Sequence, residues 1–253
     1  MMEEPLKQQT DIARAAALIA DPSRARMLKC LADGRPLPAS ALAGEAGVSA
    51  ATASVHLAKL VAGGFVTVER QGRHRYYRLA GPDVSAALEA LALIAPPLPV
   101  TSLKQSNRAG ALHRARTCYD HLAGQLGTGL MGALIDRGVL TGYDGVHRPD
   151  EAVRDRPASY GGDIRYELTD SGRTRLRALG VDTDQLPPRR PAVLYCVDWS
   201  EHRHHLGGGL GAALTARLFA LDWVRWGAAP RVVQVTEEGA TGLARMFGLR
   251  LGW

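Results

Sequence analysis

The chain has little cysteine and few aromatic residues: of 253 residues, three are Cys and 6% are Phe, Trp or Tyr. Cys30, Cys118 and Cys196 are too few and too scattered for a disulfide framework, which excludes the class of small secreted proteins held together by disulfides. No run approaches the ~18 apolar residues of a membrane-spanning helix. The polar start MMEEPLKQQT lacks a basic-then-apolar export signal. We therefore expect a cytoplasmic protein with no membrane partner.

Familiar catalytic motifs are missing as well. The glycine-rich segment 207–211 (GGGLG) does not follow a strand in a βαβ unit and lacks the Gly-Lys-Ser/Thr ending of a phosphate-binding loop, so it predicts close helix packing instead. A serine hydrolase needs a Gly-x-Ser-x-Gly elbow, which is absent. Residues 100–253 contain no strand that runs into a Gly-rich cofactor loop, as a fused methyltransferase would. The sequence therefore predicts that the protein is not an enzyme.

What the sequence does contain is an ordinary globular composition with a basic balance. Its 31 Lys and Arg exceed its 25 Asp and Glu, which gives a net charge of +6, and 46% of the residues are hydrophobic. At roughly 100–150 residues per domain, this length predicts about two domains. Because proline stops helices and central strands, we place the boundary at Pro96–Pro99. The expected domains are residues 1–98 and 109–253.

Cap and turn signals divide the first hundred residues into short helices and one hairpin. Asp21 before Pro22 is typical of a helix start. Gly47-Val48-Ser49 predicts a tight turn between two helices, with Ser49 capping the second. Alternating residues then predict two strands around Gly72. The expected elements are helices at 11–19, 24–32, 41–46, 50–62 and 82–94, and strands at 65–70 and 74–79.

Small polar and basic side chains gather on the helix at 50–62 and on the hairpin after it. Short donors near a helix N-terminus are typical of contacts to base edges and phosphates in the major groove. Between residues 54 and 80, five Lys or Arg stand against one Glu, which favours binding to a phosphate backbone. The predicted DNA contacts are Ser49, Thr52, Ser54, His56, Lys59, Arg70, Arg73, His74, Arg75 and Arg78.

Three segments of this region resemble the winged-helix domain of the ArsR/SmtB transcriptional repressors. They are ADPSRARML at 20–28, VS with TxSxHLxxL at 48–60, and GRHRYYRL at 72–79. The resemblance covers residues 11–95, about a third of the chain. It implies a homodimer that binds double-stranded operator DNA near its own promoter and leaves it when an effector arrives. It also makes residues 50–60 the recognition helix and Gly72 the wing tip; DNA binding itself is expected to need no cofactor.

The departures from that family concern its sensors. Residues 37–42 (LPASAL) hold no Cys, and the helix at 82–94 holds no His, so both familiar metal sites are missing. Val55 stands where the family often has an Arg before the His of the recognition helix, which weakens base readout from that position. The long segment 100–253 is absent from ordinary members. We therefore expect effector sensing in that segment.

A weak internal repeat runs through the C-terminal half. HLAGQLG at 121–127 resembles HLGGGLG at 205–211, an offset of 84, and TDSG at 169–172 resembles TEEG at 236–239, an offset of 67. The difference of 17 predicts an insert in the first copy, around residues 143–162. Duplication is favoured over chance similarity because two motifs recur in the same order. We expect an α+β protein, mainly α with small β-hairpins, in which residues 109–182 and 190–253 are degenerate winged-helix-like repeats that each read helix, turn, hairpin, helix.

The repeat aligns candidate sensor residues. An expected helix at 109–136 would put Cys118 and His121 on one face, while Cys196 precedes His205, the counterpart of His121. A Cys/His set from both copies is a candidate for binding zinc, copper or a softer ion. A thiol pair that reports oxidation and a set of buried core residues are the alternatives.

A small molecule is the other candidate effector. Asp120 and Asp198 each follow a cysteine by two residues, and aromatic residues surround both copies. The sequence leaves two interpretations open: an apolar pocket in which Asp or His orients the ligand, and a plain aromatic core. The aromatic set comprises Tyr119, Tyr195, Trp199, Phe219, Trp223 and Trp226.

These features together predict a dimeric DNA-binding repressor whose C-terminal domain senses an effector, either a metal ion or a small molecule. The rival prediction is a winged-helix protein-interaction adaptor, or a module fused to an enzyme, that has no specific DNA binding. Specific operator binding in physiological salt discriminates between them.

Overall fold

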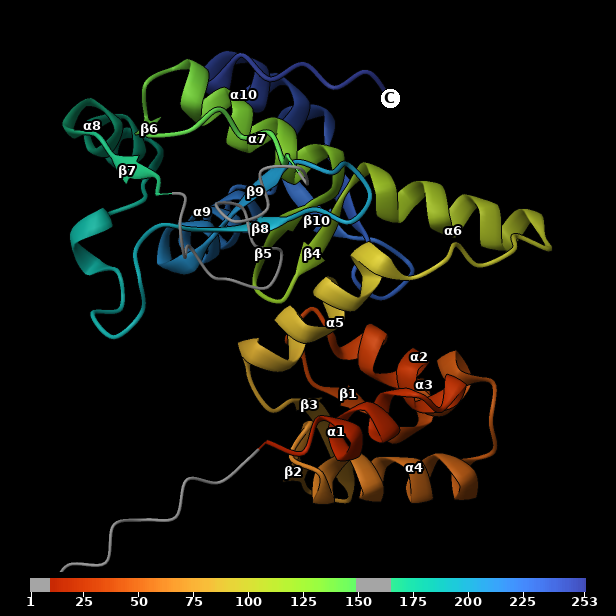
Figure 1. The fold of residues 1–253 in the computed structure, drawn as a ribbon. Coiled ribbons are helices and arrows are strands. Elements are labelled where there is room, and N and C mark those ends of the chain that lie inside the picture. The colour runs from red at the N-terminus through yellow and green to blue at the C-terminus, as the bar shows by residue number, and fades with distance from the viewer. Residues whose placement is uncertain (1–9, 149–164) are drawn as a thin grey trace, which may run out of the picture. The chain divides into compact units, whose positions relative to one another are not determined.

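The computed structural model describes residues 10–148 and 165–253, which divide into two compact units, one ending at Gly81 and the other spanning Pro82–Trp253 (Figure 1). The predicted insert at 143–162 lies mostly outside the described residues. No helix within the described ranges is long and apolar enough to cross a bilayer.

The first unit is a winged helix built as the cap signals predict. The Asp21 side chain accepts hydrogen bonds from the Ser23 and Arg24 amides, Gly47 ends a helix at φ +70°, and Ser49 accepts from the Thr52 amide. A small antiparallel sheet has the strand order β1-β3-β2. Its elements are α1 (Ile12–Ile19), α2 (Pro22–Leu31), β1 (Leu37–Pro38), α3 (Ala39–Ala46), α4 (Ala50–Ala62), β2 (Val66–Gln71) and β3 (His74–Leu79).

The second unit starts with two helices and continues with two copies of one motif. Each copy reads hairpin, helix, hairpin, helix, and every hairpin is an antiparallel pair. The leading helices are α5 (Pro82–Ile94) and α6 (Leu103–Arg114). The first copy holds β4 (Arg116–Cys118), β5 (His121–Ala123), α7 (Gly124–Asp136), β6 (Leu140–Thr141), β7 (Glu167–Leu168) and α8 (Asp170–Leu179). After the 3-10 turn η2 (Thr183–Gln185), the second holds β8 (Leu194–Val197), β9 (His204–Gly207), α9 (Gly208–Ala220), β10 (Val224–Trp226), β11 (Val233–Val235) and α10 (Glu237–Phe247).

The two copies match at single residues as well as in element order. Gly124 and Gly208 open α7 and α9 with φ of +72° and +73°, values that favour glycine. Thr169 and Thr236 cap α8 and α10 by accepting from the amides three residues on. The predicted order of helix, hairpin and helix is present in both copies, but a further hairpin precedes it.

The predicted helix at 109–136 is wrong. It is broken by the β4–β5 hairpin, whose turn holds Tyr119 at φ +57°, a conformation that cannot continue a helix. The four-residue leucine spacing is misleading because Leu122 belongs to strand β5 while Leu126 lies in α7. Strand β1 was also not predicted, since two residues carry no periodic pattern.

The boundary between units differs from the predicted one. The proline stretch predicts the end of the first domain at residue 98, whereas α5 groups with the second unit. A buried ion pair holds it there: Arg231 donates to Glu89 of α5 at 2.5 Å and, through Nε, to the Thr117 carbonyl at 2.9 Å.

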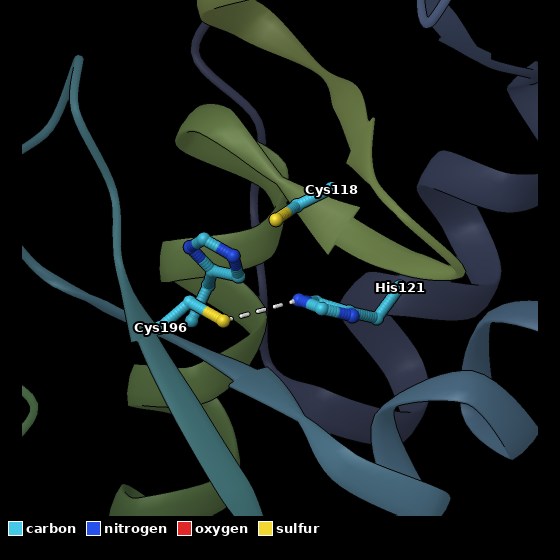
Figure 2. A group of neighbouring side chains, drawn as sticks. Cys118, His121 and Cys196 are labelled. Carbon is cyan, nitrogen blue, oxygen red and sulfur yellow. Dashed lines mark hydrogen bonds between the residues drawn. The ribbon is translucent and has the colours of Figure 1, made fainter. Parts of the chain in front are cut away.

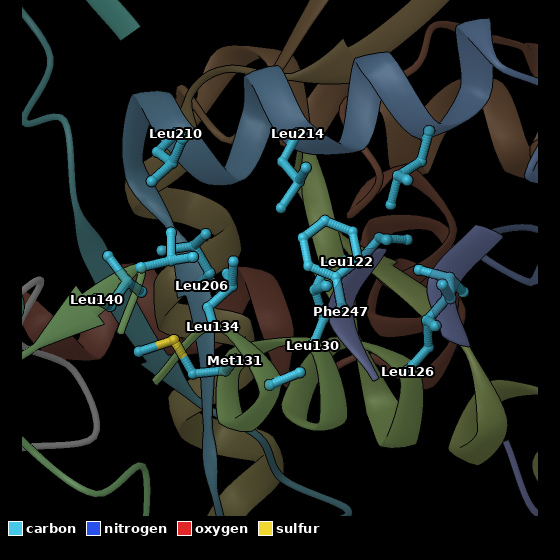
Figure 3. Packing of buried hydrophobic residues seen from close by; sticks show 14 of the residues in the cluster. Leu122, Leu126, Leu130, Met131, Leu134, Leu140, Leu206, Leu210, Leu214 and Phe247 are labelled. Carbon is cyan, nitrogen blue, oxygen red and sulfur yellow. The ribbon is translucent and has the colours of Figure 1, made fainter. Parts of the chain in front are cut away.

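The core of the second unit lies between the two copies. Leu126, Leu130 and Leu134 of α7 face the side of α9 that carries Leu210 and Leu214 (Figure 3). Glycine lets α7 and α9 approach the hairpins before them, because a Cβ at Gly127 would lie 2.4 Å from the Leu122 carbonyl oxygen, and one at Gly211 2.5 Å from that of Leu206. Close helix packing is thus the reason for the glycine-rich segment 207–211, as predicted.

Candidate functional site

The N-terminal half of α4 presents its polar side chains to solvent. Ser49 and Thr52 are exposed and their hydroxyls lie 2.9 Å apart, and the exposed Ser54 hydroxyl donates back to the Ala50 carbonyl at 2.9 Å. Lys59 is exposed one turn further on. These hydroxyl groups remain available to a binding partner, because a hydroxyl can rotate and replace its local hydrogen bond by a new one.

His56 differs from its neighbours on α4. Its ring is half-buried, and Nδ1 lies 3.8 Å from Oδ1 of Asp21, the cap of α2. The Asp21 carboxylate thus lies near the candidate recognition helix without a hydrogen bond to it. Of the predicted contacts on this helix, His56 is the one that is half-buried.

The wing carries opposed arginines. In the β2–β3 ladder Arg70 pairs directly with Arg75, and Gly72 makes the turn at φ +61°. Like charges directly opposite each other destabilise a hairpin, and a phosphate between them would remove that cost. Arg78 instead bonds Glu69 at 3.1 Å. Arg70, Arg73, His74 and Arg75 are exposed and Arg78 is half-buried.

The four candidate sensor residues come together in the second unit. Cys118 pairs with His121 across the β4–β5 hairpin, and Cys196 pairs with His205 across β8–β9. One potential ligand atom from each residue lies within 4.8 Å of the others. Figure 2 shows Cys118, His121 and Cys196 pointing toward one another, with the Cys196 Sγ 3.6 Å from the His121 Nε2. Cys196 is half-buried and the other three are buried.

The unequal Cys-to-His spacing of the two copies has a simple structural reason. The first hairpin turns through Tyr119 and Asp120, whereas the second has the loop 198–203 between its strands. In both, the ladder places the cysteine opposite the histidine. The prediction that helical spacing joins Cys118 and His121 is therefore wrong, while the prediction that the four residues form one set agrees with the geometry.

A carboxylate stands behind each histidine. His121 Nδ1 lies 3.3 Å from Asp120 Oδ1, and His205 Nδ1 lies 3.3 Å from Asp198 Oδ2. Both acids follow a cysteine by two residues, the regularity visible in the sequence. The arginines that pair with these carboxylates, Arg190 and Arg116, were not predicted because no sequence pattern marks them.

Charges in this cluster shift the pKa values strongly. Burial alone would raise the pKa of Asp198, but the neighbouring His205 ring and the charge of Arg116 hold it far below its usual range. Burial opposes the charged form of His205, yet Asp198 raises the pKa of that ring to about 9. Hydrogen bonding with Cys196, together with burial, raises the pKa of Cys118 to about 12. Without a cation, Cys118 is a neutral thiol.

The aromatic residues proposed as a ligand pocket are occupied with packing. Tyr195 stacks on His204 at a ring distance of 4.2 Å, and Phe219 stacks on Trp226 at 4.5 Å. Trp199 covers the guanidinium of Arg116 at 4.3 Å. Two open depressions of about 740 and 550 Å³ are lined by other residues. The alternative of an aromatic core agrees better with this geometry.

Comparison with known proteins gives the family. A family model described as a helix-turn-helix domain matches residues 19–69. The uncharacterised HTH-type transcriptional regulator YdfF of Bacillus subtilis (strain 168) is 36% identical over 242 residues, which is 95% of this chain and 99% of that protein. The chain belongs to the helix-turn-helix transcriptional regulators. Its winged helix is of the ArsR/SmtB type, as the three motifs predict.

Other relatives match the N-terminal part. The HTH-type transcriptional regulator Rv0324 of Mycobacterium tuberculosis is 34% identical over 84 residues, 33% of this chain and 37% of that protein. A solved structure from Mycobacterium bovis, described as the homodimeric winged helix-turn-helix DNA-binding domain of a possible ArsR-family regulator, is 31% identical. It covers 35% of this chain and 89% of its own, with a TM-score of 0.31.

Proposed function

We propose that this regulator is a dimeric repressor that an effector bound in the second unit releases from its operator. The observation that carries the DNA-binding part is the wing, where Arg70 and Arg75 face each other beside the exposed polar residues of α4. Two guanidinium groups that face each other on a hairpin repel, and a phosphate group between them removes the free-energy cost of that repulsion. Catalysis plays no part in this proposal.

Exposed apolar side chains support a dimer. None of the residues of α1 is buried in the single chain, although its sequence IARAAALI is mostly apolar. Ile12 of this helix is 76% exposed, and Ile94 of α5 is 80% exposed. Apolar surface of this kind marks protein–protein contact. The occupant we propose is a second copy, as the related M. bovis domain is described as homodimeric.

A buried connection supports control from the second unit. Cys118 ends strand β4, the carbonyl of the preceding Thr117 accepts from Arg231, and Arg231 pairs with Glu89 of α5. Helix α5 begins three residues after wing strand β3 ends. A ligand that shifts β4 therefore acts on α5, the helix that directly follows the wing in the chain. A coupling free energy of ~1–3 kcal/mol would change operator affinity about 5- to 150-fold.

Binding to the DNA upstream of its own gene tests the proposal. Fluorescence anisotropy in physiological salt should give nanomolar affinity for that DNA and at least about a thousandfold weaker binding to a scrambled duplex. Equally weak binding to both duplexes, lost as salt rises, would instead identify the rival adaptor. Native mass spectrometry of the same sample should show a dimer, and a monomer at micromolar concentration would contradict that part of the proposal.

A further inference from the structure

We propose that Cys118, His121, Cys196 and His205 form one binding site for a thiophilic cation of tetrahedral preference, of which Zn²⁺ is the probe. The strands deliver the four side chains without any rearrangement of the ladder, since each cysteine already faces its histidine. Neighbouring ligands of a tetrahedral zinc ion lie roughly 3.3–3.8 Å apart, given bond lengths of about 2.3 Å to sulfur and 2.0 Å to nitrogen. The observed limit of 4.8 Å is close enough for side-chain rotation to close the shell.

His205 supplies a second, independent observation. Its side chain is fully buried, and neither ring nitrogen makes a hydrogen bond of good geometry with any described residue. A buried polar atom without a partner is costly. With Nδ1 beside Asp198, a cation bonded to Nε2 would satisfy the ring.

The surroundings of the site match those of metal-bound histidines. A histidine that binds a metal usually directs its other nitrogen at a carboxylate, which fixes the ring and raises its basicity. Asp120 and Asp198 stand in that position behind the two rings, at 3.3 Å in each case. In turn Arg190 and Arg116 hold the two carboxylates. Each copy thus contributes a thiol, an imidazole and a carboxylate behind it.

The donor set selects the class of cation. Two sulfur and two nitrogen ligands in a tetrahedral arrangement suit Zn²⁺ and softer ions, whereas Mg²⁺ and Ca²⁺ take oxygen ligands. Two thiolates also balance a divalent charge in a buried site, and both thiol protons leave to solvent on binding. Four protein ligands leave no open position for a reacting water, as in structural zinc sites.

Cobalt titration of the full chain under a phosphine reductant tests the proposal. One Co²⁺ per chain should give thiolate-to-metal charge-transfer absorption and the intense visible bands of tetrahedral cobalt, both removed by excess Zn²⁺. Cys118→Ser and Cys196→Ser should each lose these bands. Cys30→Ser is the matched control, because Cys30 lies in the first unit and hydrogen-bonds Glu45 at 3.7 Å, and it should keep them.

Thiol counting keeps the test valid if a variant does not fold. In the wild-type chain, Zn²⁺ should slow the reaction of Cys118 and Cys196 with an aromatic disulfide reagent and leave the reaction rate of the buried Cys30 unchanged. The proposal is overturned if the reduced chain binds no Co²⁺ or Zn²⁺ at micromolar concentration. It is equally overturned if the double Cys118→Ser, Cys196→Ser variant binds as the wild type does, or if mild oxidation joins Cys118 to Cys196 while the reduced chain ignores the cation.

The regulatory role of the site rests on the proposed function, but different results would overturn the cation site and the regulatory function. A chain that binds one Zn²⁺ through these residues but keeps the same operator affinity retains the cation site and loses the effector role. A chain that binds its operator specifically but takes up no cation loses the site and retains the DNA-binding function.

Discussion

The two hairpins that meet at the Cys/His cluster carry the same residues in different surroundings. The Asp198 side chain is fully buried and binds Arg116, the Gly124 amide and Ser200, whereas Asp120 is 32% exposed and binds Arg190. Arg116 and Gly124 belong to the first copy, so Asp198 joins the two copies. The two copies therefore share the ligand geometry, but the carboxylate of the second copy is a fully buried anchor while that of the first is partly exposed.

Removing each carboxylate in turn should expose this difference most strongly. Asp198→Asn leaves the buried guanidinium of Arg116 without its ion pair, so we expect a loss of about 3–5 kcal/mol in the free energy of unfolding. Asp120→Asn should cost at most about 1 kcal/mol because water can solvate Arg190. Urea unfolding followed by circular dichroism measures both, and equal losses would contradict the anchoring role of Asp198.

The buried ion pair between Glu89 of α5 and Arg231, which lies between β10 and β11, should titrate. Burial raises the pKa of Glu89, but the charge of Arg231 outweighs it and holds that pKa below the ordinary value of 4.5. The stabilisation is therefore present above that ordinary value and is lost as the pH falls through the lowered one. Glu89→Gln should cost about 2 kcal/mol at pH 7, and the gap to the wild type should shrink toward pH 3. A gap independent of pH would refute the ion pair.

Matched glycines test whether the close approach of helix and hairpin is equivalent in the two copies. Gly127→Ala and Gly211→Ala both push a methyl group against a backbone carbonyl, and each should cost about 1–3 kcal/mol. Gly132→Ala in the same helix α7 meets nothing within 4 Å, so it should stabilise by up to about 1 kcal/mol. Thermal unfolding of the three variants gives the ranking. A destabilised Gly132→Ala variant would count against this packing argument.

The sequence predicted the first unit far better than the second. Local signals such as the Asp21 cap and Gly47 determine the winged helix, so α4 and β3 begin and end at the expected residues. In the second unit the hairpins have two to four residues per strand and depend on contacts distant in the chain. The Thr117 amide bonds the Arg231 carbonyl, for example. The internal repeat nevertheless indicated the Cys/His set, because equivalent cysteines and histidines recur in both copies even where the loops between them differ.

The smallest expected effect concerns the wing and leaves the second unit unchanged. Arg75→Ala should reduce the salt dependence of DNA binding by about one counterion and leave the unfolding of the second unit unchanged, since Arg75 is exposed at the end of the wing. Anisotropy titrations at several salt concentrations measure the slope. An unchanged slope would exclude Arg75 from phosphate contact, and Thr67→Ala on the exposed part of β2 serves as the control.

Operator affinity measured with and without Zn²⁺ tests the central claim most directly. The wild-type chain and the Cys118→Ser, Cys196→Ser variant would be titrated onto the DNA upstream of the gene under reducing conditions. Our account predicts that Zn²⁺ weakens wild-type binding about 5- to 150-fold and leaves the variant unaffected. The same affinity with and without Zn²⁺ in the wild type would contradict it.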